Sequence, residues 1–315
     1  MDSEESENRI NRAKFAGRWY PAQPKRLAAD LQRYLAEATP HTPSPRGAIL
    51  PHAGLSFSGP GMAEAFRNVD TAGVWQIVIL SPSHYVRLAP NMIHYGDFES
   101  HETPLGHIAG APGFWNGGEV SEPNIETGGP AGPPTPLAEA NRAVEMEHGL
   151  ELFFPFVRHL FGEDVRVAAA LIPEISALPA LKPMADTLLE RIEAGSGIER
   201  TLLVISSDFT HYGPGFGYAP FGIGPLQEVE ARVAEDDREV AELAAECDPQ
   251  GLLRRYADRD ITVCGRYPIL LGAELFRRLS YRGRLTNYYN SNSFGGSRRE
   301  FVCYASVLYG PEERV

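Results

Sequence analysis

Four short apolar runs, each followed by small or polar residues, constrain the fold of this chain more than any other feature. They occupy residues 47–50, 77–80, 167–172 and 201–205. Continuous apolar strands of this kind are typical of a sheet that is buried on both faces. Because helical segments separate the runs, the pattern predicts an α/β fold with a mainly parallel central sheet flanked by helices.

Helical spacing and stop signals place several helices around these strands. Leu27, Leu31, Tyr34 and Leu35 recur at helical spacing after an aromatic segment at residues 17–21. Further helices are expected at residues 184–193, 226–245 and 268–279. The end of the chain reads as two strands, with alternating side chains at residues 301–308.

The length of 315 residues allows one large domain or two ordinary ones. Residues 1–13 are acidic and polar at their start and are expected to form a flexible N-terminal arm. Residues 110–136 are rich in glycine and proline, which predicts a long loop insertion. Because neither side of this insertion carries its own set of strands, residues 14–315 are predicted to form a single domain.

Charge and cysteine content limit the partners and the compartment. The formal net charge of -12 disfavours nucleic acid and anionic membrane surfaces. No apolar run approaches the roughly 18 residues that a membrane-spanning helix needs. The three cysteines form no C-x-x-C pair, which favours reduced thiols in a reducing compartment. We therefore expect a cytoplasmic protein.

Two of the apolar strands are followed by histidines. His52 follows the first strand and His84 follows the second. In open α/β sheets, ligands bind at the carboxyl ends of the strands. Two imidazoles at this edge can share one metal ion. The alternative for each histidine is a structural role as a hydrogen-bonded residue.

The fourth strand is followed by Asp208 and His211. Asp208 can bind a metal or orient an imidazole that does. His211 can act as a general acid or base, because the reference pKa of histidine lies near neutrality. The alternatives are a helix N-cap for Asp208 and a surface position for His211.

Two further positions carry candidate chemistry. Glu147 and His148 open a predicted helix, and the alternative is a solvated acidic first turn. Cys264 precedes the helix expected to begin at Pro268, where a helix N-terminus lowers a thiol pKa. The alternative for Cys264 is a small buried apolar side chain.

Several signatures of common enzyme classes are absent. The chain has no G-x-G-x-x-G, no P-loop, no nucleophile elbow and no H-E-x-x-H. This argues against dinucleotide binding, nucleotide hydrolysis, a serine hydrolase of that fold and a zincin protease.

An ordered set of short motifs resembles the Memo family, whose bacterial members include a protein of the AmmeMemoRadiSam system. The motifs span nearly the whole chain and occur in the family's order. They are residues 16–21, 51–54 with 58–59, 80–84, 103–106, 147–148, 206–208 with 211–212, and 264–265 with Pro268. This resemblance implies a fold like that of the class III extradiol (LigB-type) dioxygenases.

The resemblance also implies a site with one divalent metal ion, iron(II) being favoured and copper or zinc being alternatives. His52 and His84 match the two histidine ligands of the dioxygenases, and Cys264 matches the third ligand of Memo proteins. His211 matches the acid/base histidine, and Asp208 lines the site. A thiolate ligand is softer than a carboxylate, which shifts the preference toward copper or zinc.

The function implied is a metal-dependent oxidoreductase that acts on a small polar or phenolic substrate. The candidates for its substrate pocket are Tyr85, Glu147, His148 and Tyr212, and the alternative for the two tyrosines is a place in the aromatic core. The alternatives are a non-enzymatic module that binds metal or peptide, and a zinc-dependent hydrolase. The family name implies a pathway link to a radical S-adenosylmethionine protein and an Amme-type protein.

Overall fold

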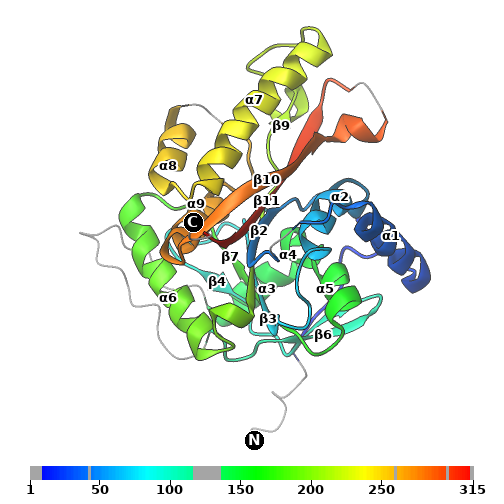
Figure 1. Ribbon diagram of the computed structural model, residues 1–315, viewed down its shortest axis with the longest axis vertical. Coiled ribbons are helices and arrows are strands. Elements are labelled where there is room, and N and C mark those ends of the chain that lie inside the picture. Colours follow the sequence, from blue (N-terminus) through cyan, green and yellow to red (C-terminus); the bar gives the residue numbers. More distant parts are fainter. Residues whose placement is uncertain (1–8, 42–43, 116–135, 259–260, 296–297, 313–315) are drawn as a thin grey trace, which may run out of the picture.

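The computed structural model describes residues 9–41, 44–115, 136–258, 261–295 and 298–312 (Figure 1). The insertion predicted at residues 110–136 falls mostly outside these ranges. The strands form one sheet. Their bounds are β1 Ile10–Asn11, β2 Gly47–Leu50, β3 Gln76–Ser81, β4 His94–Tyr95, β5 Ser100–Thr103, β6 Gly106–Gly110, β7 Arg166–Leu171, β8 Thr201–Ser206, β9 His211–Tyr212, β10 Tyr281–Asn290 and β11 Phe301–Pro311.

The four predicted apolar runs form the parallel centre of the sheet. The strand order is β1-β5-β6-β7-β3-β8-β2-β11-β10, with β4 beside β7 and β9 beside β11. The pairs β7–β3, β3–β8 and β8–β2 are parallel. The pairs β5–β6, β2–β11 and β11–β10 are antiparallel. The prediction of a single α/β domain with a mainly parallel central sheet is confirmed.

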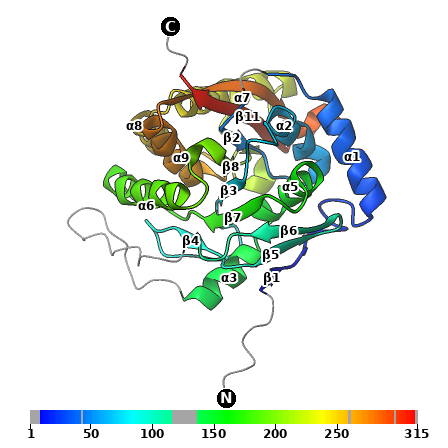
Figure 2. The same cartoon turned by 60° about the horizontal axis from the view of Figure 1, so that its bottom comes forward.

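Helices cover both faces of the sheet (Figure 2). One apolar core packs α6, α7, α8 and α9 against one face, and a second core packs α1, α2 and α5 against the other. The α-helices are α1 Pro24–Glu37, α2 Leu55–Phe66, α3 Leu137–Glu145, α4 His148–Glu151, α5 Phe154–Phe161, α6 Leu181–Ala194, α7 Leu226–Ala245, α8 Pro249–Asp258 and α9 Arg266–Arg278. Short 3-10 helices occupy Leu178–Ala180, Ile198–Arg200, Pro214–Phe216 and Ser291–Phe294.

Helix α2 was not predicted, because its Ser-Gly-Pro-Gly segment is typical of a turn. The structure shows why small residues stand there. A Cβ at Gly59 would lie 2.5 Å from the ring of Tyr34 on α1, and one at Gly61 would lie 2.7 Å from Pro51. Close packing of α2 against its neighbours therefore requires glycines that weaken the local helix signal.

The predicted flexible arm is too long at its C-terminal end. Residues 1–8 lie outside the described residues, but β1 pairs in parallel with β5 at the edge of the sheet. Asn11 Nδ2 donates to Nδ1 of His101 at 3.2 Å, and His101 Nε2 donates to the carbonyl of Val167 at 3.4 Å. One neutral tautomer of His101 satisfies both contacts. Burial lowers the pKa of His101 to about 4.

This lowered pKa predicts an acid sensitivity of the fold. A histidine whose folded pKa is depressed stabilises the protein above its unfolded pKa of roughly 6.5, and that contribution is lost as the pH falls toward the folded value. Between pH 7 and pH 5, His101 is expected to remove about 2 kcal/mol from the free energy of unfolding. Urea titrations of metal-free wild type and His101→Gln at both pH values measure this. An equal pH dependence in the two proteins would contradict the assignment.

Within the described ranges, every helix is too short or too polar to span a membrane.

Candidate metal centre

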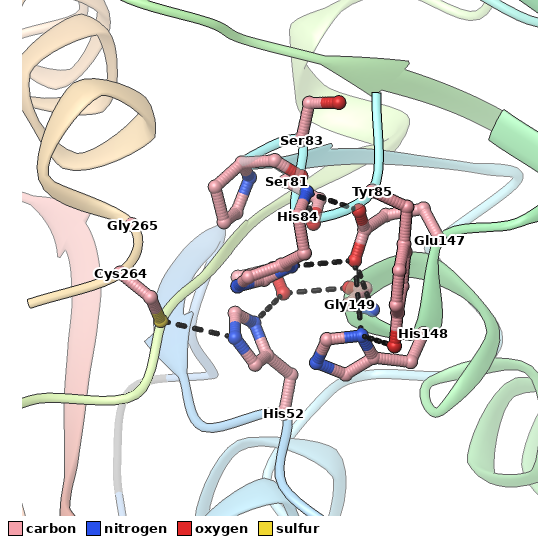
Figure 3. A network of polar contacts seen from close by, with 12 residues as sticks. His52, Ser81, Ser83, His84, Tyr85, Glu147, His148, Gly149, Cys264 and Gly265 are labelled. Atoms are coloured by element: carbon pink, nitrogen blue, oxygen red, sulfur yellow. Dashed lines mark hydrogen bonds and ion pairs between the residues drawn. The ribbon is translucent and has the colours of Figure 1, made fainter. Parts of the chain in front are cut away.

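Three histidines from different parts of the chain meet at the carboxyl edge of the parallel sheet (Figure 3). His52 follows β2, His84 follows β3, and His148 begins α4. One donor atom from each lies within 4.8 Å of those of the other two. The ring centroids are 5.0 Å apart for His52 and His84, 5.2 Å for His52 and His148, and 4.4 Å for His84 and His148.

The hydrogen bonds of Ser206 determine the tautomer of His52. The Ser206 hydroxyl donates its only proton to the carbonyl of Gly149 at 2.6 Å. Its oxygen lies 2.5 Å from Nδ1 of His52 and must therefore accept a proton from that nitrogen. This leaves the lone pair of His52 on Nε2. Burial, reinforced by His84, His148 and His211, holds the pKa of His52 well below its usual range.

Glu147 orients His84. Its Oε1 accepts a hydrogen bond from Nδ1 of His84 at 2.7 Å, and its Oε2 accepts one from the His84 backbone N–H at 2.7 Å. Oε1 also accepts from the N–H of Gly149 at 3.0 Å, which caps the start of α4. Glu147 is 1% exposed, so the alternative of a solvated acidic turn is wrong. Nε2 of His84 has no hydrogen-bond partner among the described residues.

His148 has the same arrangement. Its Nδ1 lies 3.0 Å from the Tyr85 hydroxyl and 3.2 Å from Oε1 of Glu147. Burial lowers the pKa of His148 to about 4, so the imidazole is neutral near pH 7. Metal-binding histidines typically engage one ring nitrogen with an outer polar group and present the other to the ion. In all three histidines Nδ1 is held by an outer hydroxyl or carboxylate, and Nε2 of His52 also contacts Cys264. The donor set therefore fits a metal ion.

Cys264 stands at the edge of this cluster, just before α9. Its Sγ lies 3.0 Å from Nε2 of His52 and accepts the backbone N–H of Asp208 at 3.1 Å. Burial, together with the negative charge of Asp208, raises the pKa of the Cys264 thiol well above its usual range. The expectation that the helix start lowers this pKa is therefore wrong for the metal-free site. In that state the S–H can donate to the lone pair of His52.

Asp208 and His211 come from the segment that follows β8 and lie close to His52. Oδ1 of Asp208 accepts from the backbone N–H groups of His52 and Ala53 at 2.7 and 3.2 Å, which fixes the turn that carries His52. Burial raises the pKa of Asp208. His211 lies on β9, and its Nδ1 is 2.9 Å from the carbonyl oxygen of Thr262. Asp208 is thus no helix cap, and His211 is part of the sheet.

The aromatic candidates separate into two groups. Tyr85 is 48% exposed and its hydroxyl contacts His148, so it borders the cluster. Tyr212 is 2% exposed, packs against Phe301 and donates to the carbonyl of Gly222 at 2.8 Å. The assignment of Tyr212 to the substrate pocket is therefore wrong, because its ring is in the core and its hydroxyl is satisfied.

A cavity of about 420 Å³ opens beside Cys264. Its walls come from residues 82–90, 172–174 and 261–267, and Arg87 and Arg266 both line it. The side chain of His84 is 26% exposed, so the centre is accessible from outside. Sequence analysis assigned His148 to the substrate pocket and did not count it among the ligands. His148 lies next to the buried carboxylate of Glu147, which also binds His84. This contact marks His148 as a candidate ligand, and it cannot be read from the sequence alone.

The fold and these residues define an α/β protein with a cluster of three histidines that could hold a metal ion. The chain matches the family model for Memo-like proteins over residues 11–308, and it therefore belongs to the Memo family. The protein memo-1 homolog of Caenorhabditis elegans is 28% identical over 306 residues, covering 94% of this chain and 82% of that protein. A MEMO1 family protein of Thermococcus onnurineus is 28% identical over 301 residues, covering 93% and 97%. Protein MEMO1 of Xenopus tropicalis is 27% identical over 267 residues, covering 82% and 81%.

Proposed function

We propose that this Memo-family chain is a metal-dependent oxidoreductase, with non-heme iron favoured and copper as the alternative, acting on a small polar or phenolic substrate. The observation that carries the proposal is the shared orientation of His52, His84 and His148, whose Nδ1 atoms are all held from outside. We consider two ligand sets for the metal, and both contain His52 and His84. His148 or the Cys264 thiolate supplies the third.

An iron ion held this way supplies one-electron chemistry with O₂. The chain's own residues orient the ligand histidines and transfer protons to and from the substrate. Glu147 orients His84, and Asp208 holds the turn that carries His52. Nδ1 of His211 donates to the Thr262 carbonyl, which leaves its Nε2 free to take a proton from a phenolic hydroxyl. Arg87 and Arg266 in the cavity beside Cys264 suit a substrate with an acidic or hydroxyl substituent.

A zinc-dependent hydrolase is the second candidate, and the three-histidine cluster favours it. Catalytic zinc sites commonly use three protein ligands and keep one position for water. In this version His211 or Asp208 would accept a proton from the water. The two candidates differ in their need for O₂.

The test is oxygen consumption by anaerobically purified, iron-reconstituted protein with a panel of catechols. His211→Gln is expected to lower the turnover by about 10²–10⁴-fold at unchanged metal content, because a general base is lost. His107→Gln, on an exposed histidine, is the control. Ester or phosphoester hydrolysis with zinc and without O₂ would replace the oxidoreductase by the hydrolase. Metal binding without turnover on either panel would leave a binding module.

A further inference from the structure

A second cavity lies at the opposite end of the sheet from the metal centre. It measures about 700 Å³ and lies where β3, β7 and β8 begin. Strand β3 runs for 6 residues from this cavity toward His84. At about 3.3 Å per residue, the strand that separates the two sites is itself roughly 17 Å long. The cavity is therefore separate from the metal centre and from the cavity beside Cys264.

The wall of this cavity is rich in positive charge. Arg166, Arg191 and Arg200 line it, and Asp164 is the only acidic side chain among its described lining residues. Across the described ranges, Arg166 and Arg200 form no ion pair with a carboxylate. In a chain with a net charge of -12, two guanidinium groups that share a cavity without acidic partners point to an anionic ligand.

Gln76 supplies an independent observation. It is 3% exposed and lines the cavity, and its side-chain Nε2 has no hydrogen-bond partner among the described residues. A buried N–H donor without an acceptor is rare and unfavourable in a native protein. An oxygen-rich ligand in the cavity would supply the acceptor.

Backbone hydrogen bonds at Trp75 fix the chain at Arg166 and Arg200, two exposed residues whose side chains line the cavity. The Trp75 N–H donates to the carbonyl of Arg200 at 2.9 Å, and its own carbonyl accepts from the N–H of Arg166 at 3.0 Å. The Arg200 guanidinium lies over the Trp75 ring, 4.4 Å from its centroid. Trp75 is nevertheless 56% exposed, so part of the ring is free to contact a ligand. Such preorganisation reduces the entropy lost on binding.

We propose that this cavity binds a small molecule that carries a phosphate group. Arg166 and Arg200 contact the phosphate, Gln76 donates to one of its oxygens, and Trp75 packs against the organic part. The guanidinium fork matches the oxygens of a phosphate in pairs, and two forks suit a dianion better than a single carboxylate. A cavity of this size is typical of small-molecule sites.

The test is calorimetric titration of the full chain with phenyl phosphate, inorganic phosphate and benzoate at constant ionic strength. Phenyl phosphate is expected to bind most tightly, because it supplies both the dianion and a ring. Arg166→Gln/Arg200→Gln is expected to weaken its binding by at least about 10-fold, since two charge-assisted contacts are lost. Arg33→Gln/Arg282→Gln, which changes the charge equally at exposed positions on α1 and β10, is the control.

The remaining outcomes each decide a part of the proposal. Absence of saturable binding by wild type, or an equal loss in the control variant, would overturn the site. Equal affinity for benzoate would overturn the phosphate assignment, and equal affinity for inorganic phosphate would overturn the contact with Trp75. If the double glutamine variant does not fold, Arg166→Lys and Arg200→Lys replace it. These keep the charge but remove the paired contacts, so weaker binding is again expected.

Discussion

Replacing His52 and His84 together by alanine is expected to reduce the metal content of the purified protein from near-stoichiometric to background. The two imidazoles follow β2 and β3, which end at the same edge of the sheet on either side of β8, and Nδ1 of each is held by Ser206 or Glu147. His148 is a third imidazole held in the same way, so the double variant leaves one histidine of the cluster in place. Elemental analysis of anaerobically purified protein measures the loss.

The matched control for this double variant is His107→Ala/His159→Ala, which removes two exposed imidazoles outside the cluster. Unchanged metal in the His52/His84 variant, or equal loss in the control, would contradict the site. Cys264→Ser and His148→Gln then identify the third ligand. Of these two variants, the one that loses more metal identifies the third ligand. The other residue would then only lie next to the metal without binding it.

Glu147→Gln is expected to weaken metal affinity by about 10–100-fold, the usual effect of losing an outer partner of a ligand histidine. The Glu147 carboxylate accepts hydrogen bonds from two groups of His84 and from Gly149. Glutamine has one oxygen and one nitrogen donor in place of the two oxygens. In either orientation, its NH₂ group faces an N–H of His84 or Gly149, and His84 turns away from the metal position.

Competition with a chelator gives the affinities of wild type and variant. Glu145→Gln is the control, since Glu145 is a neighbour in sequence whose carboxylate pairs with Lys14 outside the cluster. A circular dichroism spectrum that matches wild type separates loss of affinity from loss of fold. An affinity equal to that of wild type would show that His84 is oriented without Glu147.

The strand pattern was sufficient to predict the sheet and the position of most of the site. Continuous apolar runs at residues 47–50, 77–80, 167–172 and 201–205 correspond to β2, β3, β7 and β8. Because parallel strands end at one edge, the residues that follow them meet there whatever the loops do. His52, His84 and Asp208 were predicted together for this reason.

Other elements could not be predicted because their stability comes from contacts made across the fold. Helix α2 contains Gly59 and Gly61, which are poor helix formers but permit close packing on Tyr34 and Pro51. Glu147 looked like a solvated first turn because its partner, His84, is 63 residues away in the sequence. The sequence left Tyr212 open between the pocket and the core, because a strand end does not reveal which side chains turn inward, and the structure places it in the core.

The sequence by itself determined that His52, His84 and Asp208 stand at the carboxyl edge of the sheet, since the apolar pattern of each strand is a local property of the chain. The order of the strands in the sheet and the position of His148 are not local properties. Only the tertiary structure decided the tautomers and protonation states of these groups. Ser206 places the lone pair of His52 on Nε2, and burial beside Asp208 keeps the Cys264 thiol protonated without a metal. Tautomer and pKa depend on desolvation and on partners far away in the chain, and neither is encoded in a short stretch of residues.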